Sequence, residues 1–159
     1  YVITGPGSTE DLNNKSLVFL MNYGENKVLF TGDLYTAGEK DILEMYAGQP
    51  DAIKADVLKI MHHGYETSSS EAFIQAVSPK WAVAMGTRAM PGNIYSRYTD
   101  VGCTTYLSWM NGNVYVTLDG AEITVTPDNS QIADYYLNGT GSIQEEGVST
   151  GEGGDGYEI

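Results

Sequence analysis

Short apolar runs recur along the chain, and polar turns separate them. Runs of this kind, rich in Val, Ile, Leu and Phe and bounded by Gly, Asn or Asp, are typical of β-strands. The pattern predicts strands at 16–23, 27–31, 55–61, 80–85, 103–109, 113–118 and 122–126, preceded by a short apolar piece at 2–3. Hairpin turns are predicted where Gly and Asn or Asp meet between strands, at 24–26, 111–112 and 119–120.

Helical spacing appears between these strands. In segment 37–47, Ile42, Met45 and Tyr46 fall on one face. A second helix is expected after the serines at 68–70, because a serine side chain caps a helix N-terminus well. A short third helix is expected around 95–101. Strands and helices that alternate, followed by a meander of strands, predict a layered α/β (α+β) domain.

Composition divides the chain into two parts. Residues 128–159 carry seven of the 21 acidic residues and none of the eight basic ones, and 139–159 hold seven glycines. We therefore expect a folded domain at 1–127 and an acidic, Gly-rich linker or disordered tail at 128–159. No apolar run reaches the length of a membrane span, so this segment is not expected to cross a membrane.

The net charge of −13 limits the possible partners. An acidic surface repels duplex phosphates, so broad binding to double-stranded nucleic acid is not expected. A phosphate ester held by a bound metal ion stays possible, since the ion dominates its own site. Cys103 is the single cysteine, which excludes an internal disulfide. Scarce cysteine and twelve tyrosines favour an extracellular or cell-surface location over a cytoplasmic one.

Asp33 is the first candidate for chemistry. It ends the apolar strand at 27–31 in the sequence Thr31-Gly32-Asp33. Carboxyl ends of strands point into the loops where α/β proteins build their sites. The structural alternative is an Asp that only caps the following turn.

His62 and His63 are the only histidines, and they follow the predicted strand at 55–61 directly. A carboxylate and imidazoles together form the usual ligand set of zinc-type hydrolytic sites. The alternative is a histidine pair that only forms hydrogen bonds in its loop. Two strand ends that bring Asp33 and the histidines to one edge favour the metal site.

Two further features have both a functional and a structural interpretation. The serines at 68–70 lie close behind the histidines, and an N-cap is the better explanation for them. Arg88, in the loop 87–96, is placed to bind an anion, although an exposed arginine in a loop is an equally good explanation.

Several motifs in order resemble the metallo-β-lactamase superfamily. They are Asn13-Asn14-Lys15-Ser16-Leu17-Val18, Leu29-Phe30-Thr31-Gly32-Asp33-Leu34, Ala55-Asp56-Val57-Leu58-Lys59-Ile60, His62-His63-Gly64 and Ser78-Pro79-Lys80-Trp81-Ala82-Val83. The chain is most similar to the branch of ComEC-type competence proteins, and is also similar to the wall teichoic-acid phosphorylcholine esterases. The resemblance covers about residues 1–126.

The resemblance implies a fold and a site. The fold would be the C-terminal half of an αββα sandwich with one or two metal ions, usually zinc, at the edge of its sheets. Asp33 would bridge the metals and orient the attacking water, and His63 would be the last metal ligand. His62 would contact the phosphoryl group of the substrate or lie behind the ligands, and the choice between the two histidines stays open.

The chain also departs from the family pattern. The first family motif, HxHxDH, is absent and would lie upstream of Tyr1, in a missing N-terminal half of the domain. The histidine expected before the strand at 16–23 is replaced by Asn13 or Asn14, and we expect Asn14 to contact substrate. A hydrolytic metal site needs at least three protein ligands.

The expected function is therefore part of a metal-dependent hydrolase, inactive by itself. The complete domain would hydrolyse a phosphoester in a small phosphorylated or wall-derived substrate through a metal-activated water. The alternative is a degenerate half-domain that binds or supports other parts without catalysis. A DNA-processing domain of the competence type is a third possibility, and it predicts membrane segments elsewhere in the protein.

Overall fold

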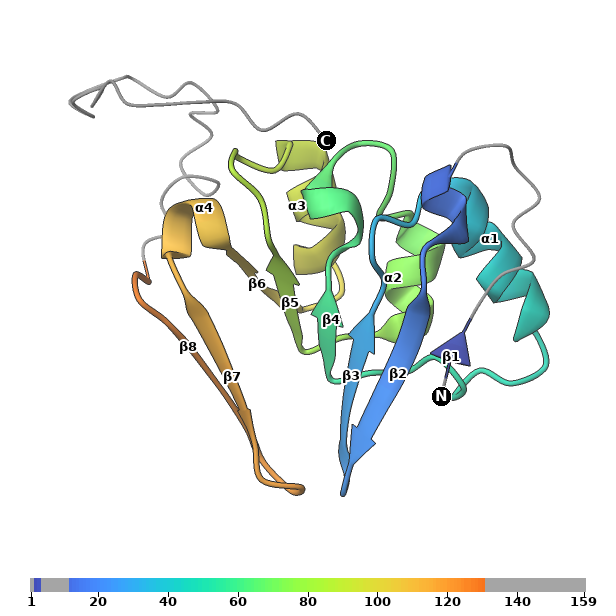
Figure 1. The fold of residues 1–159 in the computed structure, drawn as a ribbon, viewed down its shortest axis with the longest axis horizontal. Coiled ribbons are helices and arrows are strands. Elements are labelled where there is room, and N and C mark those ends of the chain that lie inside the picture. Colours follow the sequence, from blue (N-terminus) through green and yellow to red (C-terminus); the bar gives the residue numbers. More distant parts are fainter. Residues whose placement is uncertain (1, 4–11, 131–159) are drawn as a thin grey trace.

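The computed structural model describes residues 2–3 and 12–130. Its main element is a six-stranded mixed sheet in the order β1-β2-β3-β4-β5-β6, in which β2 is antiparallel to both of its neighbours, β1 and β3, and β3 to β6 are parallel (Figure 1). The strands are β1 (Val2–Ile3), β2 (Val18–Tyr23), β3 (Asn26–Phe30), β4 (Val57–Lys59), β5 (Trp81–Ala84) and β6 (Thr104–Leu107). The carboxyl ends of the parallel strands therefore lie at one edge of the sheet.

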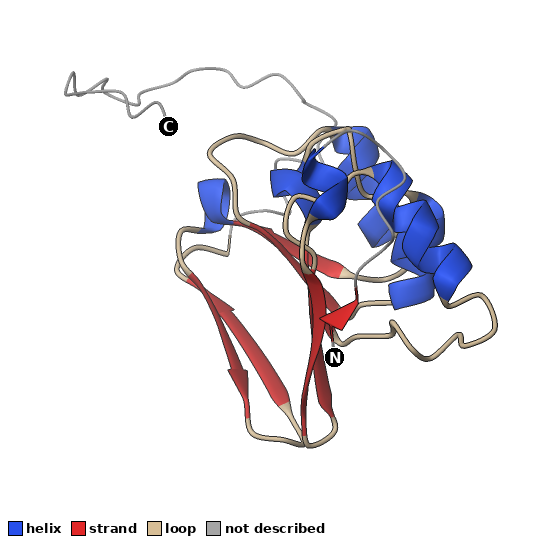
Figure 2. Cartoon of the chain, turned by 45° about the vertical axis from the view of Figure 1, so that its right-hand side comes forward, coloured by secondary structure: helices blue, strands red, loops and turns tan. Residues whose placement is uncertain are grey.

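Three helices connect the parallel strands and cover one face of the sheet (Figure 2). They are α1 (Thr36–Met45), α2 (Glu71–Val77) and α3 (Gly92–Thr99), and short 3-10 turns η1 (Leu12–Lys15) and η2 (Met61–Gly64) precede β2 and follow β4. Leu29 and Leu58 of the sheet are fully buried in one cluster with Ile42, Phe73 and Tyr98 of the helices. Parallel strands with apolar residues on the helical side need this cover.

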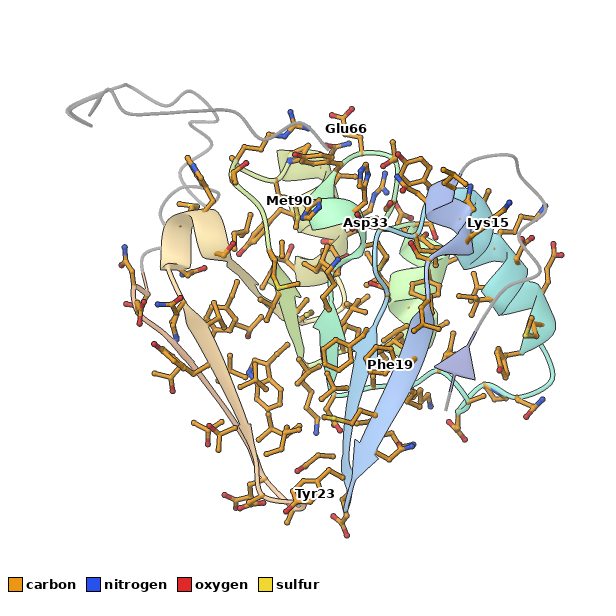
Figure 3. All side chains as sticks on the ribbon, in the orientation of Figure 1. Lys15, Phe19, Tyr23, Asp33, Glu66 and Met90 are labelled. Atoms are coloured by element: carbon orange, nitrogen blue, oxygen red, sulfur yellow. The ribbon has the colours of Figure 1, made fainter. Side chains whose placement is uncertain are left out.

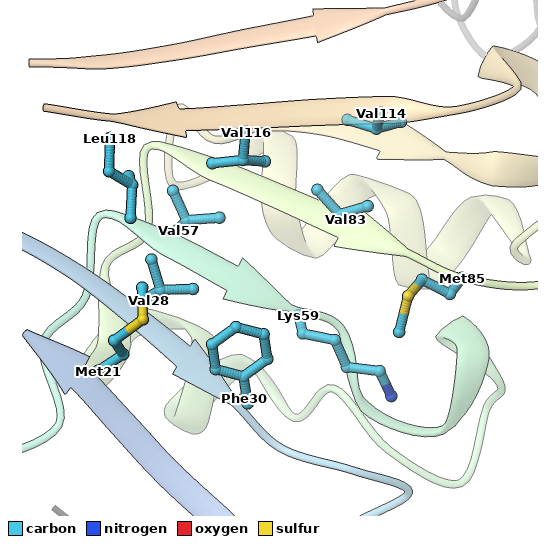
Figure 4. A pocket seen from close by; sticks show the side chains of 10 residues that line it. All are labelled: Met21, Val28, Phe30, Val57, Lys59, Val83, Met85, Val114, Val116 and Leu118. Atoms are coloured by element: carbon cyan, nitrogen blue, oxygen red, sulfur yellow. The ribbon is translucent and has the colours of Figure 1, made fainter.

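A separate hairpin forms a further layer on the opposite side of the sheet from the helices (Figure 2). Its strands are β7 (Val114–Leu118) and β8 (Ile123–Pro127), and α4 (Ser108–Asn111) leads into it from β6. The hairpin tip is fixed to the β2–β3 turn, where Glu25 N donates to Gly120 O at 2.7 Å and Gly120 N donates to Asn26 Oδ1 at 2.9 Å. An apolar cavity of about 270 Å³ lies between the hairpin and the sheet (Figure 4).

The predicted mixed α/β class is confirmed, and the order of the elements is as predicted up to β6. The hairpin turns at 24–26 and 119–120 are also confirmed. The hairpin predicted at 111–112 is wrong, because β6 and β7 belong to different sheets and α4 lies between them. The side chain of Asn111 explains this difference, since its Oδ1 accepts from Leu107 N and its Nδ2 donates to Asn129 O.

Other boundaries differ from the predictions by a few residues. β4 ends at Lys59 because the chain turns into η2 at Met61, and α3 begins at Gly92. The predicted tail lies almost wholly outside the described residues. None of the helices in the described ranges has the length and hydrophobicity that a transmembrane passage requires.

Candidate metal-binding site at the strand ends

Asp33 and His63 lie side by side at the carboxyl edge of the sheet. Asp33 follows β3 and His63 follows β4, and these two strands are parallel neighbours. The Oδ1 atom of Asp33 is 3.7 Å from Nε2 of His63, and the two side chains are 42% and 41% exposed. Asp33 is labelled at this edge in Figure 3. The expectation that two strand ends bring this pair together agrees with the geometry.

Backbone contacts fix the corner that carries Asp33. The amide of Asp33 donates to Ser16 Oγ at 3.1 Å, and the carbonyl of Gly32 accepts from Lys59 Nζ at 2.6 Å. Gly32 has φ +54, and a Cβ there would approach Ser16 Cβ to 3.0 Å. A side chain at position 32 would therefore disturb the contact that holds Asp33.

The ring of His63 has a defined orientation. Its Nδ1 forms a short hydrogen bond to the carbonyl of Met85, which follows β5. A carbonyl only accepts, so Nδ1 donates to it, and Nε2 of the neutral ring is then the nitrogen with the lone pair. An Nδ1–H donated to a backbone carbonyl is the arrangement that metal-ligating histidines use. A carboxylate oxygen and an imidazole nitrogen both belong to the ligand types that zinc accepts in proteins.

The histidine loop has a left-handed backbone. His62 and His63 have φ values of 41° and 58°, and Gly64 follows at +83°. Residues with a Cβ adopt this region rarely, because Cβ then crowds the following carbonyl. Such backbone strain is found mainly at functional sites. At Gly64 an added Cβ would lie 2.7 Å from Met90 Cε, so glycine suits this position for two reasons.

His62 points to a different environment from His63. Its Nδ1 is 2.7 Å from Thr67 Oγ1, and its ring packs against Tyr35 and Tyr65 with centroid separations of 4.8 and 4.9 Å. The two imidazole centroids are 6.0 Å apart. Since the short Asp33 contact is to His63, the geometry favours His63 over His62 as the partner of Asp33.

Lys59 is a member of this site that the sequence did not single out. Its side chain is 11% exposed, and its Nζ is 3.6 Å from Asp33 Oδ1. Burial lowers the pKa of Lys59, and the neighbouring Asp33 carboxylate opposes this shift. The apolar stem of the side chain borders the cavity under the β7–β8 hairpin, and its ammonium group lies at the end of that cavity (Figure 4).

A second cavity, of about 360 Å³, opens beside His63. Its lining is His63, Tyr65, Met85, Gly86, Thr87 and Ser108. The guanidinium of Arg88 lies 3.9 Å above the ring of Tyr65, which is a cation–π contact. Arg88 is exposed, so its donors remain accessible to an anion near this cavity. The predicted anion-binding role of Arg88 is compatible with this position and stays a prediction.

The serines behind the histidines have structural contacts. Ser70 caps α2, because its Oγ accepts from Phe73 N at 3.4 Å. Ser68 Oγ donates to Leu34 O at 2.6 Å, and Ser69 Oγ is 2.8 Å from the hydroxyl of Tyr98. The N-cap explanation is therefore confirmed for Ser70.

Glu39 fixes the same serine segment and was not predicted. Its buried carboxylate accepts from the amides of Ser69 and Ser70 at 2.6 and 2.8 Å. Burial raises the pKa of the Glu39 carboxyl, although these hydrogen bonds and Arg97 lower it in part. A single acidic residue in an amphipathic helix gives no signal in the sequence that it faces inward.

Asn14 is buried in η1, and its Oδ1 accepts from the amide of Gly38 at 2.9 Å. This contact ties η1 to the first turn of α1, and the predicted contact of Asn14 with substrate stays a prediction.

Among the described residues, no group of three or more His, Cys, Asp or Glu side chains could hold a metal ion.

Comparison with known proteins places the chain near bacterial competence proteins. No family model matches the chain. It is 44% identical over 71 residues to ComE operon protein 3 of Bacillus subtilis, and 41% identical over 90 residues to competence protein ComA of Neisseria gonorrhoeae. It is also 38% identical over 79 residues to recombination protein 2 of Haemophilus influenzae.

These matches cover 45%, 57% and 50% of this chain but only 9%, 12% and 9% of the respective proteins. The chain thus spans about a tenth of the length of these relatives. The similarity to ComEC-type competence proteins that the motifs suggested is confirmed at this level.

Proposed function

We propose that this chain supplies the Asp33–His63 edge of a divalent-metal site in a hydrolase of the metallo-β-lactamase fold, which acts on phosphoester bonds. The observation that carries the proposal is the 3.7 Å separation of His63 Nε2 from Asp33 Oδ1, with the other ring nitrogen, Nδ1, hydrogen-bonded to the Met85 carbonyl. Zinc is the metal that this mixture of imidazole and carboxylate favours.

When bound, the metal would lower the pKa of a coordinated water toward neutrality and polarise the scissile group. Asp33 would hold the metal and orient that water, and His63 would be a second ligand. His62 lies in the same loop and would contact the phosphoryl group of the substrate. The cavity beside His63 would admit the substrate, with Arg88 at its border to bind the anionic part.

The remaining ligands would come from outside this sequence. Two ligands are fewer than a hydrolytic zinc site requires, so we expect the 159-residue chain to bind zinc weakly and to show no turnover. Small phosphorylated or wall-derived compounds are the proposed substrates, and an extracellular or cell-surface location is proposed with them. Residues 1–127 would form the catalytic portion and 128–159 a linker.

The test uses the complete gene product that contains this sequence. We expect the purified protein to contain zinc and to hydrolyse bis(p-nitrophenyl) phosphate, a phosphodiester probe. Asp33→Asn and His63→Asn should each lose the metal and the activity. Asp51→Asn is the matched control, because Asp51 is exposed and forms its ion pair with the nearby Lys54, and it should change neither.

A complete protein without zinc and without hydrolysis would favour the alternative of a non-catalytic module. Activity that survives both Asp33→Asn and His63→Asn would refute the assignment of these ligands. Comparison with Asp51→Asn separates the loss of a metal ligand from the effect of removing one negative charge anywhere on the protein.

A further inference from the structure

We propose that Lys59 is a built-in counter-ion that competes with a divalent metal for Asp33 and keeps the metal affinity of the Asp33–His63 pair low; this inference rests on the metal site proposed above. Lys59 Nζ and His63 Nε2 approach the same oxygen of Asp33, at 3.6 and 3.7 Å. A cation thus already lies beside the carboxylate oxygen that faces the histidine.

One hydrogen bond holds the ammonium group and another holds the backbone of the same residue. Nζ donates to the Gly32 carbonyl at 2.6 Å, and Thr31 Oγ1 donates to the Lys59 carbonyl at 2.6 Å. The stem lies along an apolar cavity with Val28, Phe30 and Met85, as Figure 4 shows. With 11% of the side chain exposed, Lys59 has less freedom to swing into solvent than a surface lysine.

This fixed charge opposes a metal ion electrostatically. A zinc ion bound to Asp33 Oδ1 at about 2 Å would lie within about 6 Å of the ammonium nitrogen. At that distance the repulsion between a divalent ion and a unit charge corresponds to about tenfold in affinity, even at the dielectric constant of bulk water. The metal would therefore be retained only where further ligands offset the repulsion.

Removing Lys59 should change the metal affinity in opposite directions, depending on whether its role is that of a counter-ion or purely structural. If Lys59 only supported the fold, its removal would loosen the Gly32–Asp33 corner and weaken metal binding. If it competes for Asp33, its removal strengthens metal binding. Lys59→Met removes the charge and keeps an unbranched apolar stem for the cavity, whereas Lys59→Arg keeps the charge.

The experiment is a Zn²⁺ titration of the 159-residue chain, followed through the ring nitrogens of His63 by NMR. We expect Lys59→Met to bind Zn²⁺ about tenfold more tightly than the wild type, and Lys59→Arg to bind like the wild type. Lys80→Met is the matched control, since Lys80 pairs with Asp56 at 3.1 Å, is 68% exposed and should leave the affinity unchanged.

If folded Lys59→Met binds Zn²⁺ with unchanged or lower affinity, the counter-ion role is overturned. A lower Zn²⁺ affinity of Lys59→Arg would overturn it as well. The double variant Asp33→Asn with Lys59→Met should lose the increase in Zn²⁺ affinity that Lys59→Met shows alone. If Zn²⁺ perturbs His63 equally in wild type and Asp33→Asn, the proposed metal site itself fails. Asp33-dependent binding that Lys59→Met does not strengthen would refute only the counter-ion.

Discussion

The left-handed backbone at His63 predicts that glycine and alanine substitutions will have an inverted order of stability. The perturbation is a parallel replacement of His63 by Gly, Asn and Ala. All three variants lose the imidazole and its hydrogen bond to Met85. The differences between them therefore report the backbone at φ 58° and ψ 13°.

Two opposing terms set the magnitude. A residue with a Cβ in the left-handed region costs about 1–2 kcal/mol, whereas glycine costs roughly 0.5–1 kcal/mol through its greater freedom in the unfolded chain. The net expectation is that His63→Gly is more stable than His63→Ala by about 0.5–1 kcal/mol. His63→Asn should fall between them, because Asn tolerates this conformation better than Ala.

The assay is equilibrium unfolding in urea, with the midpoint and the slope compared among the variants. Gln75 is exposed in α2 and gives the matched control. There the order should be the usual one, with Gln75→Ala more stable than Gln75→Gly by about 1 kcal/mol. If His63→Ala proved at least as stable as His63→Gly, the inferred strain in the histidine loop would be wrong.

Three further predictions concern the surroundings of the site. Burial raises the pKa of the Glu39 carboxyl above its ordinary value, so the folded state binds this proton more tightly and the stability from protonated Glu39 is lost as pH rises through the folded pKa. Unfolding at several pH values should show the stability of the wild type rising relative to Glu39→Gln as pH falls from neutral into the acidic range, whereas a constant difference would contradict this. Gly24→Ala should destabilise by at least about 1–2 kcal/mol and speed hydrogen exchange at Gly120, because its Cβ would lie 2.2 Å from the Gly120 oxygen; unchanged exchange would argue against the fixed hairpin tips. Long-range ¹H–¹⁵N spectra should place the His63 proton on Nδ1, and a proton on Nε2 would contradict the Met85 hydrogen bond.

The fold was largely predictable because apolar runs and turn residues act locally. The turn before Asn26 and the turn at Asp119–Gly120 join strands that do pair. Asn111–Gly112 has the same local signal, yet it follows a helical turn and leads into another sheet. Turn chemistry therefore shows where the chain reverses, but long-range packing decides which strands pair.

The site was predictable only to the extent that it follows from strand order. Asp33 and His63 meet because β3 and β4 are parallel neighbours and both end at one edge. The choice between His62 and His63 depends on the loop backbone and on the Met85 carbonyl, 22 residues away in sequence. The sequence pattern did not identify Lys59 as a site residue because it lies within a strand. Its apolar stem borders the cavity, and only its ammonium group reaches Asp33.

The acidic composition determines how any metal experiment must be designed. With 21 acidic residues and a net charge of −13, the chain is expected to attract divalent cations to exposed carboxylates, so total metal content identifies a site only when wild type is compared with the Asp33 and His63 variants. Mg²⁺ prefers oxygen ligands, whereas zinc binds imidazole nitrogen readily. Zn²⁺ should therefore shift the ring nitrogens of His63 at concentrations where Mg²⁺ does not. If both ions perturb His63 alike, general electrostatic attraction explains the effect, and the Asp33–His63 pair is not a selective site.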